Sequence, residues 1–518
     1  MTLLVPLLFA AYLVLYAFAL ALPPFPHAAA IEQNPLQQKP QYSLDEWLQR
    51  EEDIALDNLL ANVAPFGRNV QDAAPGSVIA SPSKEHPNYY YQWVRDAAIT
   101  TSTLVDLYAD DPFDPLSSKL DIILNAYASL QDELQHTKNP SGTFADLSGL
   151  GEPKFEADGT PFIGSWGRPQ RDGPALRAIT LMAYLRAYNA SNPSLWTSDE
   201  GPDWFKPLYD PRMPANSIIK ADLEYVSHYW NASGFDLWEE VQGLHFFTAM
   251  VQLRALREGA ALALAFDDSG AAAWYTQQAG LLEKFLPSFW DASKGHLIET
   301  LSSARSGLDC GLLLGSLHGS PAANNTVPGT PPYAPYSDEI LVSLLALVYD
   351  QRNRFPINSA PPASPEGTSP LEGVGLGRYP EDVYDGYGTT PFGGNPWFLC
   401  TSSASEILYR VAAHLQETDE LEITELGMPF WEALLADAPS FADLKPGSYG
   451  SKDGLFVDVL ERLRSVGDGF LEVVKKHTDA EGSLSEQFDR VTGFERGARD
   501  LTWSYGAFLQ AVRARGRV

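Results

Sequence analysis

The chain has 518 residues, of which 36 are Lys or Arg and 66 are Asp or Glu, so its formal net charge is −30. This charge argues against a nucleic-acid-binding protein, because such proteins need a basic surface to neutralise phosphates. With 45% apolar and only 20% charged residues, the chain is not a disordered acidic tail either. Its length allows about three domains, although one large closed architecture can use as much chain.

An apolar run opens the chain at residues 3–22, and the first charged residue is Glu32. Small residues and two prolines end the run, which is typical of a cleaved signal peptide. We therefore expect a signal peptide at residues 1–21, an N-terminal extension at residues 22–41 and a secreted mature protein. A vacuolar protein and an uncleaved membrane anchor are the alternatives, because no basic residue precedes the run and about 20 apolar residues can span a bilayer.

Several stretches place apolar residues at helical spacing, whereas strand patterns bounded by hairpin turns are scarce. Ser337 precedes one of these stretches in the position of an N-cap. Two segments rich in Pro, Gly and Ser are flanked by helical sequence, so we interpret them as long functional loops. The pattern predicts an all-α fold with one large domain from about residue 42 to residue 518. The helical stretches are residues 173–189, 244–256, 337–348, 404–415 and 501–512, and the loops are residues 319–336 and 355–377.

Three N-x-S/T sequons, at Asn189, Asn231 and Asn324, lie beside loop-like sequence. They are candidate glycosylation sites in a secreted chain, although such triplets also arise by chance. Cys310 and Cys400 are the only cysteines, and the sequence leaves open whether they pair. The nine histidines are scattered, and phosphate-loop, H-E-x-x-H and G-x-S-x-G motifs are missing, so we expect neither a metal nor a cofactor.

Two segments carry carboxylates suited to hydrolysis. In the first, Trp238 precedes Glu239 and Glu240. A carboxyl group packed against aromatic rings tends to keep its proton and can act as a general acid. The competing interpretation is that both glutamates occupy the first turn of a helix, where negative charge is favoured. The second segment carries Glu486, and two carboxylates on opposite faces of a sugar are what glycoside hydrolysis needs.

Aromatic residues recur at residues 89–96, 164–168, 377–382 and 395–398, and the first three of these segments also carry Arg or Asp. Rings can cover the C–H faces of a sugar, while Arg and Asp can hold its hydroxyls through oriented hydrogen bonds. Taken singly, each Trp is more often explained by core packing and each Arg–Asp pair by a structural ion pair. The recurrence of both together is what indicates a sugar site.

Eight blocks of the sequence, in the same order, resemble fungal and yeast glucoamylases of glycoside hydrolase family 15. The resemblance implies an (α/α)6 toroid with the active site in a funnel of loops. It also implies an exo-acting, inverting hydrolase that releases glucose from the non-reducing ends of starch, dextrins or glycogen, more slowly at α-1,6 bonds. The partner would be the α-glucan, with no nucleic acid and no membrane after signal cleavage, and the enzyme a monomer. The blocks are residues 81–96, 151–155, 164–177, 236–240, 377–382, 395–398, 485–487 and 499–503.

The same resemblance assigns roles to individual residues. Glu239 matches the general acid and Glu486 the general base that activates water. The matches to substrate-binding groups and aromatic walls are Tyr89, Trp93, Arg95, Asp96, Trp166, Leu237, Trp238, Glu240, Arg378, Asp382, Trp397 and Trp503.

The chain departs from some relatives in three ways, and one of them is that it has fewer cysteines than the relatives that carry disulfides. It ends soon after the last block, so we expect no C-terminal starch-binding domain, and the loop at residues 384–394 is longer. The longer loop is expected to reshape the sites for the second and third sugars. The alternatives are a catalytically silent carbohydrate-binding or regulatory protein on the same fold, and another inverting α-glycosidase such as a trehalase or glucodextranase.

Overall fold

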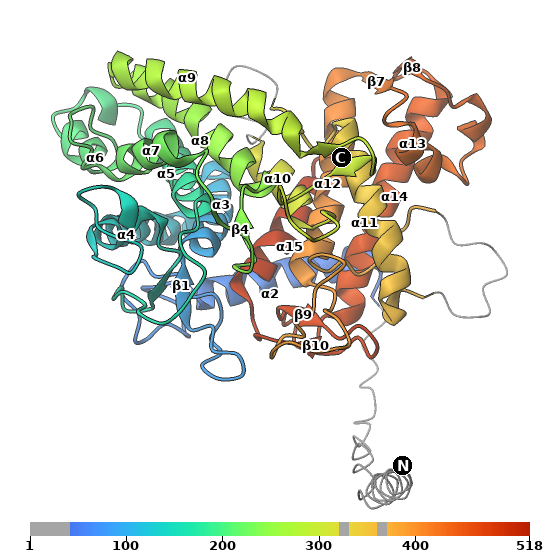
Figure 1. Cartoon of the computed structure of the whole chain (residues 1–518), viewed down its shortest axis with the longest axis horizontal. Coiled ribbons are helices and arrows are strands. Elements are labelled where there is room, and N and C mark those ends of the chain that lie inside the picture. Colours follow the sequence, from blue (N-terminus) through green and yellow to red (C-terminus); the bar gives the residue numbers. More distant parts are fainter. Residues whose placement is uncertain (1–41, 321–330, 360–369) are drawn as a thin grey trace, which may run out of the picture. The chain divides into compact units, whose positions relative to one another are not determined.

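Six helices form a closed ring at the centre of the computed structural model, which describes residues 42–320, 331–359 and 370–518. Each helix packs against the next, and the sixth packs against the first (Figure 1). In ring order these inner helices are α3 (Val94–Asp110), α5 (Asp172–Ser191), α8 (Phe246–Ala265), α10 (Gly311–Gly319), α12 (Phe398–Thr418) and α15 (Thr502–Arg515).

Six outer helices surround the ring, and each precedes one inner helix in the chain. This alternation is an (α/α)6 toroid, so the fold implied by the sequence blocks is confirmed. The outer helices are α2 (Leu44–Ala61), α4 (Pro115–His136), α7 (Ile218–Tyr229), α9 (Ser269–Phe285), α11 (Asp338–Arg354) and α14 (Gly454–His477), while α6 (Gly201–Leu208) and α13 (Met428–Leu435) lie in the connections.

Among the described residues, strands occur only as short antiparallel pairs in the connections between helices. They shape the loops at the ends of the ring. The pairs are β1 (Tyr91–Trp93) with β2 (Lys154–Glu156), β3 (Gly234–Phe235) with β4 (Gln242–Gly243), β5 (Trp290–Asp291) with β6 (His296–Leu297), β7 (Glu420–Ile423) with β8 (Gly447–Gly450), and β9 (Gln487–Phe488) with β10 (Glu495–Arg496).

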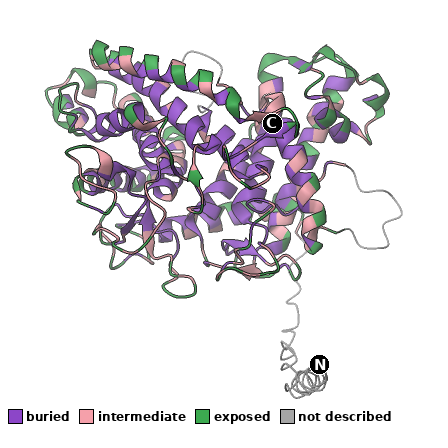
Figure 2. Cartoon of the chain, viewed as in Figure 1, coloured by how far each residue is buried: buried purple, intermediate pink, exposed green. Residues whose placement is uncertain are grey.

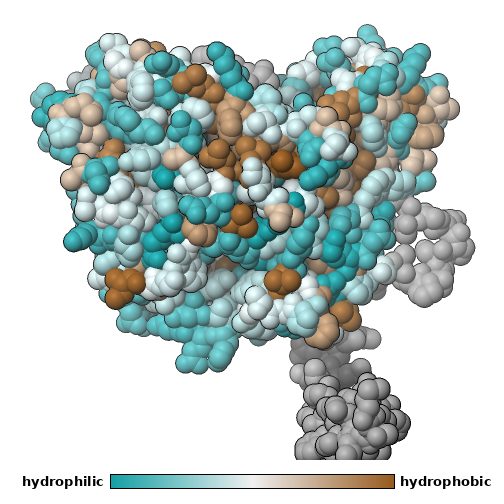
Figure 3. Space-filling view, in the orientation of Figure 1, coloured by the Kyte–Doolittle hydropathy of each residue, from teal (hydrophilic) through white to brown (hydrophobic). Residues whose placement is uncertain are grey.

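Burial separates the two layers (Figure 2). The inner helix α8 is buried at six consecutive residues from Phe246 to Val251, because it touches ring neighbours on both sides and the outer layer behind. The outer helix α14 instead buries Leu455, Val459 and Leu463, which lie on one face of an amphipathic helix. On the face shown in Figure 3, hydrophilic residues predominate and hydrophobic ones form scattered patches.

The five predicted helical stretches are all helical, in α5, α8, α11, α12 and α15. Ser337 does stand at the N-cap position of α11, but its side chain makes no capping hydrogen bond. The predicted signal peptide and N-terminal extension, and the middle parts of both predicted loops, lie outside the described residues. Across the part of the chain that is described, none of the helices has the length and hydropathy needed to cross a membrane.

The two cysteines form a disulfide. Cys310 precedes α10, Cys400 lies in the first turn of α12, and their Cα atoms are 5.8 Å apart. Both are fully buried. The bond therefore joins two neighbouring helices of the inner ring.

The sequons differ in their surroundings. Asn231 is exposed in the turn after α7, as glycosylation requires, whereas Asn189 is partly buried in the last turn of α5 rather than in a loop. Asn324 lies outside the described residues. Of the described sequons, Asn231 is thus the better placed for a glycan.

Candidate active site

A cavity of about 80 Å³ lies where the first turns of the inner helices meet the connecting loops. Arg95 and Asp96 begin α3, Trp397 directly precedes α12, and Trp503 lies in the first turn of α15. The cavity gathers both predicted catalytic glutamates and most of the predicted binding residues. Its lining is Ala80, Tyr89, Trp93, Arg95, Asp96, Leu237, Trp238, Glu239, Arg378, Tyr384, Trp397, Glu486, Leu501 and Trp503.

Glu239 sits in the tight turn between β3 and β4. Asp236 builds this turn, because its Oδ1 accepts hydrogen bonds from the backbone N–H groups of Glu240 and Val241 at 2.7 and 2.8 Å. Glu239 itself has a φ of 69°, a left-handed conformation that costs a non-glycine residue about 1–3 kcal/mol and is typical of functional sites. The helix α8 begins only at Phe246, so the interpretation of Glu239 and Glu240 as a helix first turn is wrong.

The contacts of Glu239 fall on one of its two oxygens. Oε1 accepts hydrogen bonds from Trp93 Nε1 at 2.6 Å and Gln170 Nε2 at 3.0 Å, and it lies 3.7 Å from a guanidinium nitrogen of Arg95. No residue in the described ranges donates a hydrogen bond to Oε2. Because the side chain lines the cavity, Oε2 is the oxygen left for a bound substrate.

Glu486 immediately precedes β9 and is only 1% exposed. Its Oε2 accepts a hydrogen bond from the Tyr384 hydroxyl at 3.4 Å, whereas its Oε1 has no hydrogen-bond partner among the described residues. Burial raises the pKa of Glu486 to about 8, against the opposing effects of the Tyr89 hydroxyl and the Arg378 guanidinium. The carboxyl group therefore keeps its proton at neutral pH.

Arg95 and Asp96 form a buried charged pair at the start of α3. Arg95 donates to Gln170 Oε1 at 2.7 Å and to Asp172 Oδ2 at 3.1 Å, and its Nε lies 3.3 Å from Asp96 Oδ2. Burial raises the pKa of Asp96 to about 6, although Arg95 lowers it and Glu239 raises it further. These groups present fixed donors and acceptors to sugar hydroxyls.

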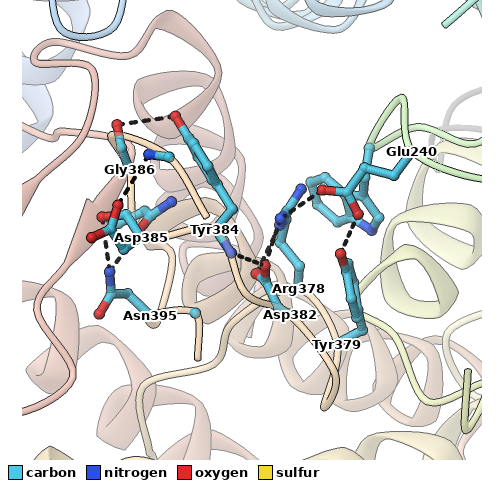
Figure 4. A network of polar contacts seen from close by, with 12 residues as sticks. Glu240, Arg378, Tyr379, Asp382, Tyr384, Asp385, Gly386 and Asn395 are labelled. Carbon is cyan, nitrogen blue, oxygen red and sulfur yellow. Dashed lines mark hydrogen bonds and ion pairs between the residues drawn. The ribbon is translucent and has the colours of Figure 1, made fainter. Parts of the chain in front are cut away.

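Arg378 is held on the other side of the cavity by two carboxylates (Figure 4). It forms a bidentate pair with Asp382 at 2.9 and 2.6 Å, and it lies 3.0 Å from Glu240 Oε1. Tyr379 also donates a hydrogen bond to Glu240. Burial raises the pKa of Glu240, but Arg378, Tyr379 and then Arg305 more than offset it, so the net pKa is lowered. Glu240 is therefore ionised at neutral pH.

The aromatic walls are also fixed. Trp238 donates its N–H to Asp309 Oδ1 at 2.9 Å, and its ring lies 5.6 Å from that of Trp397. The Nε1 atoms of Trp397 and Trp503 are buried and have no hydrogen-bond partner among the described residues. Trp166 does not line the cavity but packs against Trp93, with ring centroids 6.0 Å apart.

Of the predicted residues, Trp166, Glu240 and Asp382 therefore lie behind the cavity wall or beside it, and the others line it. The sequence assigned no role to several residues that complete the site. Gln170 and Asp172 belong to the block at residues 164–177, so a signal was present, and Tyr384 opens the long loop. Arg305 and Asp309 come from a segment with no such signal.

This arrangement suits acid–base hydrolysis of a sugar. Two carboxyl groups face one small cavity, and each has one oxygen that accepts no hydrogen bond from the described residues. Buried Arg and Asp side chains beside them can hold hydroxyls, and tryptophan rings can cover the C–H faces.

Residues 53–513 match the family described as Glycosyl hydrolases family 15. The chain is 37% identical over 497 residues to the glucoamylase GLU1 of Saccharomycopsis fibuligera, a match that covers 92% of this chain and 91% of that protein.

Two solved structures are similar in fold as well as in sequence. A Saccharomycopsis fibuligera glucoamylase is 36% identical with a TM-score of 0.81, over 92% of this chain and 96% of that one. The family 15 glucoamylase of Hypocrea jecorina is 37% identical with a TM-score of 0.80, over 92% of this chain and 72% of that one.

Proposed function

The chain belongs to glycosyl hydrolase family 15, and from this membership we propose the roles of the residues in its catalytic pocket. The protein is a glucan 1,4-α-glucosidase that removes glucose from the ends of starch-type glucans. The observation that carries the proposed roles is the single small cavity that holds Glu239 and Glu486 together with Arg95 and Arg378. A catalytically silent relative would lack one of the two carboxyl groups.

The size of the cavity supports exo action. At about 80 Å³ it is too small for a polymer to run through it. Arg95, Asp96 and Arg378 hold the hydroxyls of that terminal glucose, and Trp397 and Trp503 cover its faces. Glu240, ionised and next to Arg378, is placed to bind the following sugar.

Glu239 acts as the general acid. Its Oε2 donates a proton to the glycosidic oxygen while the bond from C1 to that oxygen breaks, and the shortened glucan leaves with a new hydroxyl. Trp93 and Gln170 donate to Oε1, so they stabilise the negative charge that Glu239 gains as the proton departs.

Glu486 acts as the general base. Its unpartnered Oε1 accepts a proton from water as the water oxygen forms a bond to C1 from the opposite face, which gives β-glucose. A raised pKa strengthens a base once it is ionised. After each turnover Glu486 carries the proton taken from water, and the raised pKa of Glu486 favours this protonated form.

The anomer released first tests this scheme. Nuclear magnetic resonance during the first minutes of maltose hydrolysis should show β-glucose before mutarotation. Initial α-glucose would instead require a retaining reaction and would remove Glu486 as the base.

We also propose that residues 1–21 are cleaved as a signal peptide, that the mature enzyme is secreted, and that it works as a monomer. The apolar run at residues 3–22 supports cleavage, and one chain alone supplies both proposed catalytic glutamates. N-terminal sequencing of enzyme recovered from the culture medium tests cleavage and secretion, and light scattering tests the monomer. An N-terminus at residue 1, activity retained in the cells or a dimer mass would overturn the respective point.

A further inference from the structure

The block at residues 151–155 contains a buried lysine that has no role in the proposed mechanism. Lys154 lies on β2, directly opposite Trp93 on β1 in the antiparallel pair. Its side chain is only 2% exposed. Within the described ranges, no carboxylate lies close enough to its ammonium group to form an ion pair. A buried charge without a partner is costly, so some other group must compensate it.

Four aromatic rings compensate it. The Lys154 nitrogen lies 3.7 Å from the ring centroid of Trp166, 3.9 Å from Tyr91, 4.2 Å from Phe162 and 4.4 Å from Trp93. All four distances are inside the roughly 6 Å range of cation–π attraction, in which the negative ring faces stabilise the cation. The four rings and Lys154 together form what we call the lysine cage.

The rest of the block holds the cage in place. Glu152 is 2% exposed and accepts from Arg168 Nε at 2.7 and 2.9 Å. The other nitrogens of Arg168 donate to the backbone carbonyls of Gly164 at 2.8 Å and Phe162 at 3.0 Å. Glu152 thus fixes the loop that supplies the rings of Phe162 and Trp166.

One ring of the lysine cage is hydrogen-bonded to the proposed general acid. Trp93, one of its rings, donates its N–H to Glu239 Oε1 at 2.6 Å. Burial lowers the pKa of Lys154 to about 8, while the charges of Glu239 and Glu156 raise it and that of Arg168 lowers it. Below pH 8 the ammonium is therefore charged and interacts with Glu239.

A purely structural lysine would not need this arrangement. Methionine has a similar length and no charge to desolvate, so it would fill the same space between the rings at lower cost. The charge is consequently the feature that requires a function, and the reacting group whose charge acts on it is Glu239.

We propose that Lys154 is a positioning residue for the proton donor. Its ammonium group fixes the Trp93 ring whose N–H holds Glu239, and its charge favours the negative charge that Glu239 gains as it protonates the leaving oxygen. This inference rests on the proposed acid role of Glu239.

The test compares two substrates that differ in their need for a proton. Maltose needs protonation of the leaving sugar, whereas α-D-glucosyl fluoride loses fluoride without a full proton transfer. Lys154→Met should lower kcat on maltose about 10- to 100-fold, the range expected for a misplaced catalytic group, and lower kcat on the fluoride less than about threefold. Lys154→Arg, which keeps the charge, should retain most of the activity on maltose.

Two further variants keep the test decisive. Phe162→Leu removes one ring of the cage away from the pocket lining and should give a smaller loss with the same substrate pattern, even where Lys154→Met folds poorly. Lys84→Met is the matched control, because the Lys84 nitrogen lies 4.1 Å from the Tyr90 ring centroid but its side chain is 58% exposed; it should change neither activity.

The outcomes separate this inference from the proposed function. Glu239→Gln measured on the same substrates should lose maltose activity and keep fluoride activity; equal losses would overturn the acid role itself. If Glu239→Gln behaves as expected but Lys154→Met loses both activities equally, or neither, the positioning role of Lys154 is overturned alone.

Discussion

The two ends of the inner-helix ring carry two very different cavities. The catalytic cavity, at the first turns of the inner helices, has a volume of about 80 Å³, whereas a second cavity of about 340 Å³ is lined by later residues of the same helices. Trp503 lines both. Volume alone would therefore select the wrong end as the binding site.

The two cavities differ in whether their buried polar groups are paired with other groups of the protein. In the second cavity most charges are neutralised by protein neighbours. Arg186 and Arg254 share Glu258 at 2.5 and 2.7 Å, and Arg410 pairs with Glu406 at 2.6 Å.

In the catalytic cavity several buried polar atoms have no hydrogen-bond partner among the described residues. Buried polar groups are normally satisfied, so atoms left unpaired in a cavity indicate ligand contacts. Besides Arg95 Nε and Asp96 Oδ2, which lie 3.3 Å apart as an ion pair, the unpaired atoms are Glu486 Oε1 and the Nε1 atoms of Trp397 and Trp503.

The largest expected effect follows removal of the proposed base. Glu486→Ala should lower kcat on maltose about 10³-fold or more, because no group then takes the proton from water. Azide needs no deprotonation and fits the space vacated by the side chain, so adding it should restore turnover and form β-glucosyl azide. Chromatography of the products with and without azide measures this.

The acid variant is the natural control for azide. Glu239→Gln should not respond to azide, because its defect lies in protonating the leaving group. If azide instead rescues Glu239→Gln and leaves Glu486→Ala inactive, the two roles are exchanged.

Breaking an ion pair at the second cavity should affect stability and not catalysis. Arg410→Met leaves Glu406, which is 4% exposed, without its cation. We expect a loss of about 2 kcal/mol in the free energy of unfolding, below the value for a fully buried pair because the Arg410 side chain is 30% exposed. Urea unfolding measures the loss, and Arg410→Lys should recover part of it. A fall in kcat/KM beyond about twofold would show that the second cavity does influence catalysis.

The sequence predicted most residues of the catalytic cavity and few residues of the second cavity. The sugar-binding residues are concentrated in short blocks such as residues 377–382, where Arg378 and Asp382 pair within one turn. Arg305 and Asp309 could not be found, because only the fold brings their segment to Glu240 and Trp238.

Some features of the fold could not be predicted from the sequence pattern, for a similar physical reason. Helix α10 is buried on nearly every face, so it shows no apolar and polar alternation at helical spacing. The pairing of Cys310 with Cys400 likewise depends on a Cα separation of 5.8 Å that only the closed ring determines.

Stability at the catalytic end should depend on pH. The pKa of Glu486 is about 8 in the folded protein against 4.5 for an unperturbed glutamate. Because the folded value is higher, the stabilising effect of its proton is complete below about pH 4.5 and is lost as the pH rises to 8. Glu486→Gln, which cannot ionise, should therefore be more stable than the parent by about 1–2 kcal/mol at pH 7, and by much less at pH 4. Melting temperatures of the variant and the parent at both pH values check this. A difference in melting temperature that narrows with rising pH would contradict it.

The smallest expected effect concerns single unpaired polar atoms, and it tests whether such an atom in a cavity marks a ligand contact. Trp397→Phe removes an unpaired Nε1 from the catalytic cavity, and Ser320→Ala removes an unpaired Oγ from the second one. If the first atom binds sugar, its loss should raise KM for maltose about 2- to 10-fold, the range expected for one hydrogen bond, with kcat nearly unchanged. Ser320→Ala should leave KM, kcat and unfolding within error of the parent. Equal kinetics for both variants would mean that an unpaired polar atom does not mark a ligand contact here, and the two cavities would then have to be distinguished by their carboxyl groups alone.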